Sequence, residues 1–181
     1  MGLHEDIGEI LFTAEQITEI VKRMGKQISE DYADKNLVMI SVLKGSLMFM
    51  ADLMRAVTIP CSIDFLSVSS YGSGTTTTGE VRILKDLDTS LEGKDVLVVE
   101  DILDSGMTLS YLLSSLKARR PRSIRLCTLL DKPERRRVDI KADYEGVQVP
   151  DKFLVGYGLD YAEKYRNLPY IGVLKPEIYA E

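Results

Sequence analysis

The chain has few of the residues that build metal centres and disulfide frameworks. It contains one histidine, His4, and two cysteines, Cys61 and Cys127. A single histidine near the N-terminus excludes a histidine-based metal site and a catalytic triad. Each cysteine lies in an apolar, strand-like run without paired spacing, so we expect buried, reduced thiols in a cytoplasmic protein.

Long apolar runs and an excess of basic residues are also absent. No stretch approaches the roughly 18 apolar residues of a membrane span, and Glu5, Asp6 and Glu9 stand where a secretory signal would be basic. We therefore expect neither a membrane span nor a signal peptide. The net charge of -5 argues against nucleic acid as a partner. A length of 181 residues suits a single domain.

Helical and strand-like segments alternate along the first two thirds of the chain. A capping box at Thr13 and Gln16 opens an expected helix that ends near residue 32. A second helix is expected at 46–56, and Leu109 to Leu116 form one face of a third. Strand-like runs cover 36–43, 60–70, 81–85, 96–99 and 123–130. This alternation predicts an α/β fold with a mostly parallel open sheet flanked by helices.

The composition changes near residue 131, where short strands begin to alternate with turns that contain proline and glycine. We expect this tail and the N-terminal segment to form a small hood lobe over the strand ends. The core would span about 36–130, and the hood about 1–35 and 131–181. Ligands of such sheets bind outside the carboxyl ends of the strands.

The segment Val96–Thr108 concentrates charged and turn-forming residues at one such strand end. Glu100 and Asp101 follow an apolar run, Asp104 comes next, and Ser-Gly-Met-Thr then opens a helix. The free N–H groups and the dipole of a helix start favour a phosphate. Three carboxylates there fit a ligand that also carries hydroxyl groups or a divalent cation. A sugar phosphate with magnesium meets both demands, although acids at a well-capped helix start are the simpler structural interpretation.

The pattern from Glu100 to Thr108 resembles the signature of the type I phosphoribosyltransferases. The resemblance implies that Glu100 and Asp101 hold the ribose hydroxyls of phosphoribosyl pyrophosphate (PRPP) and take part in binding Mg²⁺. It implies that Ser105, Gly106, Met107 and Thr108 cradle the 5′-phosphate. Met107 stands where relatives often have lysine or asparagine, so one side-chain contact to the phosphate is lost.

Further positions resemble the hypoxanthine-guanine phosphoribosyltransferases in particular. Lys44 and Gly45 match a loop that contacts pyrophosphate, preceded by a Leu-Lys peptide that is often cis. Arg166 matches an arginine that meets pyrophosphate. Ser70 and Tyr71 match the start of a long mobile loop. That match favours a lid over a simple hairpin tip for the Gly- and Thr-rich segment 72–79.

The resemblance also implies a purine pocket. Lys132 matches the lysine that donates to the 6-oxo group, and Phe153 matches the ring that stacks on the base. Leu154 matches a residue whose backbone reads the base edge. Asp160 matches an acid near a magnesium ion and the base.

The implied reaction joins N9 of hypoxanthine or guanine to the phosphoribosyl group and releases pyrophosphate, with Asp104 taking or sharing the N7 proton. The family commonly forms dimers and tetramers, so a homo-oligomer is expected by analogy. One alternative is an RNA-binding regulator of the same fold, which could use the basic runs 119–122 and 135–137. Another is a xanthine-guanine or adenine phosphoribosyltransferase.

Overall fold

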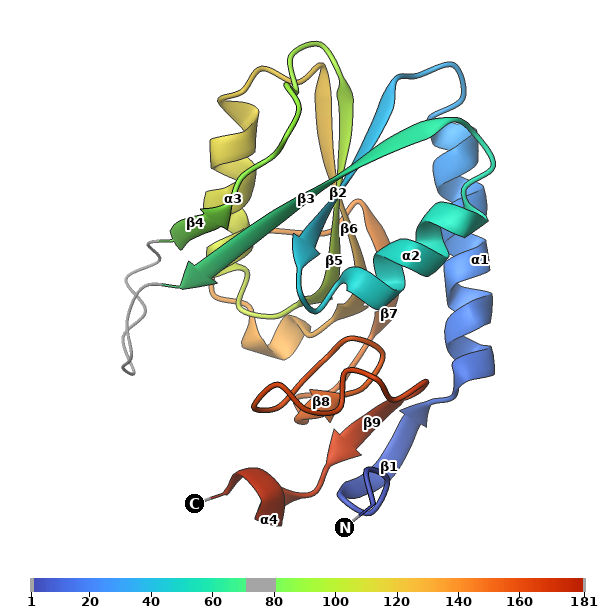
Figure 1. Ribbon diagram of the computed structural model, residues 1–181, viewed down its shortest axis with the longest axis vertical. Helices are drawn as coiled ribbons and strands as arrows, with labels where there is room; N and C mark the ends of the chain where they lie inside the picture. Colours follow the sequence, from blue (N-terminus) through green and yellow to red (C-terminus); the bar gives the residue numbers. More distant parts are fainter. Residues whose placement is uncertain (1, 71–80, 181) are drawn as a thin grey trace.

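The computed structural model describes residues 2–70 and 81–180. Its main sheet has six strands in the order β4-β3-β2-β5-β6-β7 (Figure 1). Strands β3, β2, β5, β6 and β7 are mutually parallel, and β4 pairs with β3 antiparallel. The strands are β2 (Leu37–Leu43), β3 (Cys61–Ser70), β4 (Val81–Lys85), β5 (Asp95–Leu103), β6 (Ser123–Asp131) and β7 (Tyr144–Gln148).

Helices cover both faces of this sheet. α1 (Ala14–Asp31) and α2 (Leu47–Ala56) pack on one face, and α3 (Met107–Lys117) packs on the other. Successive residues of a strand point to opposite faces. Leu37 of β2 therefore joins the core under α1 and α2, whereas Val38 joins the core under α3. A sheet buried on both faces explains why the central strands are continuous apolar runs.

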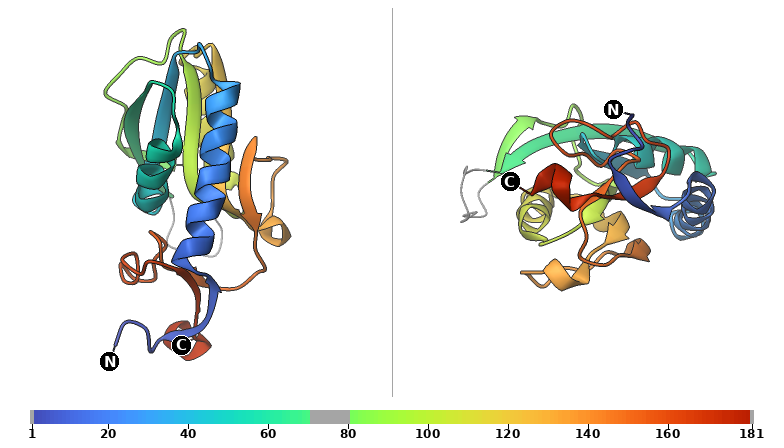
Figure 2. Two further views of the ribbon diagram at one scale, coloured as in Figure 1. Left: turned by 90° about the vertical axis from the view of Figure 1, so that its right-hand side faces the viewer. Right: turned by 90° about the horizontal axis from the view of Figure 1, so that it is seen from below.

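A second, smaller sheet lies beyond the carboxyl ends of the central parallel strands (Figures 1 and 2). It is antiparallel, in the order β1-β9-β8, and a short helix follows it. A 3-10 helix, Pro133–Arg135, follows β6 on the way to β7. The elements of this lobe are β1 (Ile7–Phe12), β8 (Leu154–Val155), β9 (Ile171–Leu174) and α4 (Pro176–Tyr179).

Most elements expected from the sequence are present, and the α/β fold is confirmed. The capping box forms as expected, because the Gln16 N–H donates to Thr13 Oγ1 at 3.2 Å and the Thr13 N–H donates to Gln16 Oε1 at 2.9 Å. β5 is longer than the expected 96–99. It continues to Leu103, which pairs with Asp131 of β6, so Glu100 and Asp101 belong to the strand.

Two elements, α1 and β7, differ from the expected division into core and hood, and β1 is an additional strand within the hood. β1 was not anticipated as a strand, and it forms because β9 pairs with it. α1 packs its apolar face on the main sheet, with Ile17, Val21 and Met24 in the larger core cluster. β7 extends the main sheet by pairing with β6. The second sheet is therefore smaller than the expected hood.

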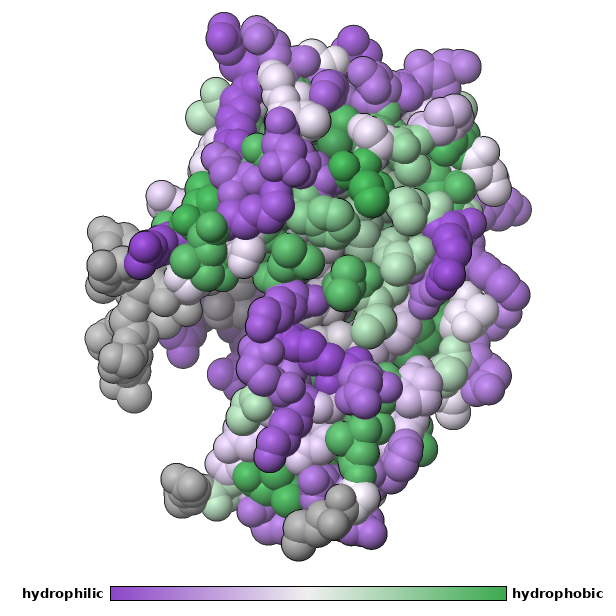
Figure 3. Space-filling model, viewed as in Figure 1, coloured by the Kyte–Doolittle hydropathy of each residue, from purple (hydrophilic) through white to green (hydrophobic). Residues whose placement is uncertain are grey.

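One face of the molecule exposes apolar side chains. Figure 3 shows them gathered over β3 and α2. The exposed fraction is 45% for Leu47, 38% for Met48 and 40% for Ile63. Within residues 2–70 and 81–180, no helix is both long enough and apolar enough to cross a bilayer.

Candidate active site

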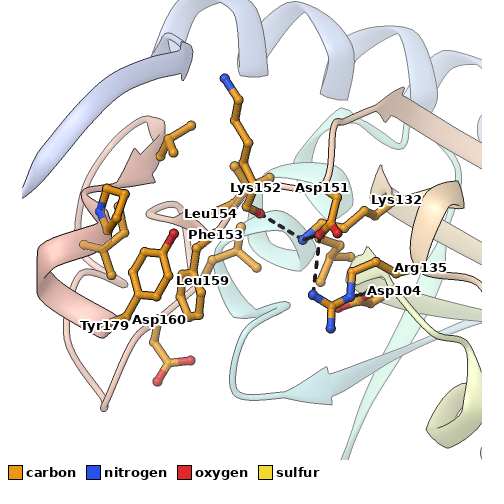
Figure 4. Close-up of a pocket in the computed structure, with 14 residues that line it drawn as sticks. Asp104, Lys132, Arg135, Asp151, Lys152, Phe153, Leu154, Leu159, Asp160 and Tyr179 are labelled. Carbon is orange, nitrogen blue, oxygen red and sulfur yellow. Dashed lines mark hydrogen bonds and ion pairs between the residues drawn. The ribbon is translucent and has the colours of Figure 1, made fainter. Parts of the chain in front are cut away.

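A cavity of about 680 Å³ lies between the end of the main sheet and the second sheet (Figure 4). Its walls come from the end of β5, the start of the 3-10 helix, residues 151–154 before and in β8, and the C-terminal helix. Cavities of about 300–1,000 Å³ are typical of small-molecule sites. Five residues singled out in the sequence line it: Asp104, Lys132, Phe153, Leu154 and Asp160.

Glu100 and Asp101 lie near the carboxyl end of β5, with partly buried side chains. Desolvation raises the pKa of Glu100 well above its usual range, and the neighbouring Asp101 raises it further. Desolvation also raises the pKa of Asp101, to about 6. The hydrogen bond that Asp101 Oδ1 accepts from the Ile102 N–H at 2.7 Å lowers the pKa and offsets only part of this rise. The two carboxylates therefore have too few hydrogen-bond donors or positive charges around them to stabilise both in the ionised form. Hydroxyl groups or a metal ion would supply these.

The turn between β5 and α3 is open toward a ligand. Gly106 precedes α3 at φ 79° and provides no side-chain cap, and the Met107 N–H donates to Ser105 Oγ at 3.4 Å. A Cβ at Gly106 would lie 2.5 Å from Ile140 Cγ2, so both the backbone conformation and the packing require glycine. The first N–H groups of a helix have no partner within the helix, and an anion is a favourable partner for them. Ser105 and Thr108 add hydroxyl groups at this position.

Asp104 follows β5 directly and faces the cavity. Arg135 Nε lies 3.3 Å from Asp104 Oδ1, within ion-pair range. The geometry is not that of a hydrogen bond, and Oδ1 is buried without a hydrogen-bond partner in the described structure. The backbone carbonyl of Asp104 accepts from Arg136 Nε at 3.1 Å. Asp104 is thus anchored through its backbone, and its carboxylate retains an unused acceptor.

Lys132 follows β6 and is only 6% exposed. Its ammonium donates to the carbonyl oxygen of Lys152 at 3.0 Å and lies 3.9 Å from Asp151 Oδ1. An ammonium has three N–H donors. One is used by the carbonyl, and Asp151 supplies countercharge nearby. The remaining donors can meet an acceptor in the cavity.

Aromatic rings form the opposite end of the cavity (Figure 4). Phe153 stacks on Tyr179 of α4, with ring centroids 4.8 Å apart and an interplanar angle of 25°. Tyr161 meets the Phe153 ring edge-on at 5.4 Å. The centroid separation leaves no room for a base between Phe153 and Tyr179. Leu154, which begins β8, is buried and lines the same end.

Lys44 and Arg166 meet at one carboxylate, that of Glu163. Lys44 Nζ lies 3.0 Å from Glu163 Oε2, and Arg166 Nη2 lies 3.4 Å from Glu163 Oε1. Arg166 also contacts Asp160 Oδ1 at 3.3 Å and donates to the carbonyl of Gly158 at 2.7 Å. The hydrogen bond from Lys44 lowers the pKa of Glu163.

The loop that carries Lys44 is packed tightly against the acidic strand. The Leu43–Lys44 peptide is cis. A Cβ at Gly45 would collide with Asp101 Oδ2, so a larger residue here would force the Asp101 carboxylate to move. Desolvation raises the pKa of Asp101, and the positive charge of Arg166 offsets part of that rise. The structure thus places Lys44, Gly45 and Arg166 next to Asp101.

Sequence reasoning missed four residues of this region: Arg135, Asp151, Glu163 and Tyr179. Arg135 and Asp151 line the cavity beside Asp104 and Lys132, and Tyr179 supports Phe153. The Arg135–Arg137 run was the available signal, but it could not show which arginine faces the site. Ser70 ends β3. Tyr71 and the expected lid at 72–79 lie outside the described residues.

The fold and the comparisons define the class of protein. Residues 9–162 match the family model for the phosphoribosyl transferase domain. An α/β sheet with an acidic strand end and an open helix start agrees with that class.

Close relatives narrow the class. The chain is 54% identical over 177 residues to the hypoxanthine-guanine phosphoribosyltransferase of Bacillus subtilis, covering 98% of each protein. A crystal structure of a hypoxanthine phosphoribosyltransferase from Staphylococcus aureus matches with a TM-score of 0.96 and 54% identity, covering 98% of this chain and 97% of that one. The chain belongs to the hypoxanthine-guanine phosphoribosyltransferase family.

A third relative is much longer. The chain is 53% identical over 180 residues to the bifunctional protein TilS/HprT of Listeria monocytogenes. It spans 28% of the length of that protein.

Proposed function

We propose that this chain transfers the phosphoribosyl group of PRPP to N9 of hypoxanthine or guanine, in purine salvage. The observation that carries the proposal is the single cavity that holds Asp104, Lys132 and Phe153 beside the open start of α3. A carboxylate, a buried cation and an aromatic ring are the groups that a 6-oxopurine requires. The names of the relatives support the same substrates.

The reaction breaks the bond between C1′ and the pyrophosphate oxygen and forms a bond between C1′ and N9. Positive charge develops on the ribose while negative charge develops on pyrophosphate. We propose that Glu100 and Asp101 hold the ribose hydroxyls and that the turn 105–108 holds the 5′-phosphate. Fixing both ends of the sugar orients C1′ toward the base.

Asp104 is proposed to accept or share the proton that leaves N7 when N9 attacks. Asp104 lines the cavity and its side chain is 44% exposed, whereas Oδ1 is buried 3.3 Å from Arg135 Nε, so Oδ2 is the oxygen proposed to meet this proton. General base help of this kind contributes about 10² to 10⁴ in rate. Lys44 and Arg166 are proposed to stabilise the negative charge on departing pyrophosphate.

Lys132 is proposed to select the base. Its ammonium can donate to a 6-oxo group, whereas the 6-amino group of adenine would place its own N–H donors against those of the ammonium. The Phe153 face that is not covered by Tyr179 would stack on the purine. Leu154 would read the base edge through its backbone.

The acidic residues fit a magnesium ion. Within the described ranges, no three His, Cys, Asp or Glu side chains lie close enough together to bind a metal ion by themselves. Mg²⁺ is commonly bound by one or two carboxylates together with waters and substrate phosphates. We propose that one or two of the carboxylates of Glu100, Asp101 and Asp160 hold it, together with waters and substrate phosphates. When bound, Mg²⁺ supplies positive charge against the pyrophosphate oxygens.

The alternative of an RNA-binding regulator gains no support from the basic runs. Arg119, Arg120 and Arg122 form ion pairs with Asp86, Glu92 and Asp95, respectively. Arg135 and Arg136 also pair with acids. Most of the expected basic patch is therefore neutralised.

We further propose that residues 1–181 act as one phosphoribosyltransferase domain, and that copies associate as a dimer or tetramer. The exposed Leu47, Met48 and Ile63 support association. Cys61 and Cys127 are both free thiols, which fits a cytoplasmic location. Light scattering of the purified protein would measure the oligomeric state.

The direct test of function is a panel of hypoxanthine, guanine, xanthine and adenine, assayed with PRPP and Mg²⁺. We expect inosine and guanosine monophosphate to form, with little turnover of adenine. Adenine turnover without hypoxanthine or guanine activity would overturn the assignment of the base. Salt-dependent RNA binding without any turnover would favour the regulator.

A further inference from the structure

Glu163 places negative charge where the proposed reaction needs to bind an anion. Its two carboxylate oxygens lie 3.0 Å from Lys44 Nζ and 3.4 Å from Arg166 Nη2. In the described part of the chain, Glu163 is the only ion-pair or hydrogen-bond partner of the Lys44 ammonium. Both cations are the ones proposed to hold pyrophosphate. The Glu163 carboxylate therefore contacts both of the cations that are proposed to bind pyrophosphate.

The fold holds Glu163 in this position. The Glu163 N–H donates to Asp160 Oδ2 at 2.9 Å, and a bridge between Tyr161 and Lys164 closes the turn. Ala162 and Glu163 have φ values of 51° and 63°, in the left-handed region. That region is unfavourable for a residue with a side chain, so surrounding contacts must maintain it. The turn presents the carboxylate to the two cations.

Arg166 is more constrained than Lys44. Its guanidinium is shared among the Gly158 carbonyl, Asp160 and Glu163. Its Nε is buried and has no hydrogen-bond partner in the described structure. A buried donor without a partner is rare in folded proteins, and the Arg166 side chain is only 24% exposed. The Lys44 ammonium, in contrast, is exposed and has two N–H donors beside the one that meets Glu163, so diphosphate can contact it directly.

We propose that Glu163 is a resident counter-anion that sets the affinity of the site for the diphosphate group. It pairs with Lys44 and Arg166, and a bound diphosphate has to compete with its carboxylate for both cations. This inference rests on the proposed function. Glu163 is thus an affinity-determining residue, not a catalytic one, because it acts on diphosphate binding through its charge and touches no reacting atom.

The sign of its effect distinguishes this role from a structural one. If Glu163 competes with diphosphate, neutralising it strengthens diphosphate binding. If Glu163 only positions the two cations, neutralising it weakens binding. The Glu163 side chain is 64% exposed, so solvent screens the repulsion and the effect is modest. We expect a change in affinity of about two- to fivefold, as for exposed ion pairs.

Calorimetric titration with inorganic pyrophosphate and Mg²⁺ tests the proposal in the full chain. Glu163→Gln should bind pyrophosphate about two- to fivefold more tightly than the wild type, and its KM for PRPP should fall without a rise in kcat. The control is Glu19→Gln, which removes another exposed acid paired with a lysine, Lys22, at 3.1 Å, on α1. The control should bind as the wild type does.

A double-mutant cycle with Lys44→Gln provides a second readout. In that background the gain from Glu163→Gln should shrink, because one of the two competed cations is absent. Unchanged or weaker pyrophosphate binding by Glu163→Gln would overturn the role of Glu163 alone. Failure of the wild type to bind pyrophosphate would overturn the proposed diphosphate site and this inference with it.

Discussion

Lys132 offers the sharpest test of how the base is selected. Its side chain is 6% exposed, and its ammonium has one close acceptor, the Lys152 carbonyl at 3.0 Å. We expect a second N–H to donate to the 6-oxo group of hypoxanthine. Replacing Lys132 by methionine keeps a similar length and removes every donor. The purine oxygen would then be desolvated without a partner.

The magnitude follows from the cost of losing a charged hydrogen bond. Such bonds contribute about 1.5–3 kcal/mol, and about 1.4 kcal/mol corresponds to a tenfold change in rate. We therefore expect kcat/KM for hypoxanthine to fall roughly 10- to 150-fold in Lys132→Met. Discrimination against adenine should weaken at the same time, because the clash between donors disappears.

The assay is steady-state turnover of hypoxanthine and of adenine with saturating PRPP and Mg²⁺. Lys152→Met is the matched control, because its ammonium pairs with Glu9 at 2.9 Å and its side chain extends away from the Lys132 end of the cavity (Figure 4). The control should keep kcat/KM within about twofold of the wild type. A folded Lys132→Met enzyme with unchanged hypoxanthine turnover would refute this reasoning.

Four further predictions concern other parts of the molecule. Asp104→Asn should lower kcat by roughly 10² or more with little change in the PRPP affinity measured by calorimetry; single-turnover rates equal to the wild type would remove Asp104 from the chemistry. Tyr179→Ala should raise KM for the purine more than it lowers kcat, since Phe153 loses its stacked support, and Tyr179→Phe should restore the wild-type value. Removing divalent cations with a chelator should abolish turnover, and added Mg²⁺ should restore it; full activity in the chelator would exclude a metal requirement. Asp64 is 4% exposed and accepts hydrogen bonds from Phe65, Asp88 and Thr89, which outweigh desolvation and lower its pKa, so Asp64→Asn should reduce the free energy of unfolding in urea by about 1–3 kcal/mol at neutral pH. That difference should shrink as the pH falls below about 3.9, the ordinary aspartate value, because the lowered pKa means that the folded state favours the ionised carboxylate, which is protonated at low pH. A difference that stays constant with pH would show that the ionisation of Asp64 does not contribute to stability.

The sheet and its flanking helices could be predicted because their signals are local. Thr13 and Gln16 form the expected capping box, and the apolar run that begins at residue 36 becomes the central strand β2. β1 escaped prediction, and the short strand β7 was expected in the hood, because each depends on a distant partner, β9 and β6 respectively. A short strand with a mixed pattern carries little information without its partner.

The site shows the same division between local and distant information. The acids and the turn from Glu100 to Thr108 are contiguous, so the sequence revealed them together. Glu163 lies 119 positions from Lys44 in the chain. Tyr179 stacks on Phe153 only because α4 returns over β8. Contacts of this kind depend on tertiary packing, which a charge or an aromatic residue in the sequence does not indicate.

The most direct test of the central claim is a crystal structure of the chain with guanosine monophosphate bound. Our account predicts the 5′-phosphate on the N–H groups of Gly106 to Thr108, the ribose hydroxyls near Glu100 and Asp101, and the 6-oxo group within hydrogen-bonding distance of Lys132 Nζ. The purine should lie on the face of Phe153 that Tyr179 leaves open. A nucleotide bound with its base away from Lys132, or its phosphate away from the start of α3, would contradict the account.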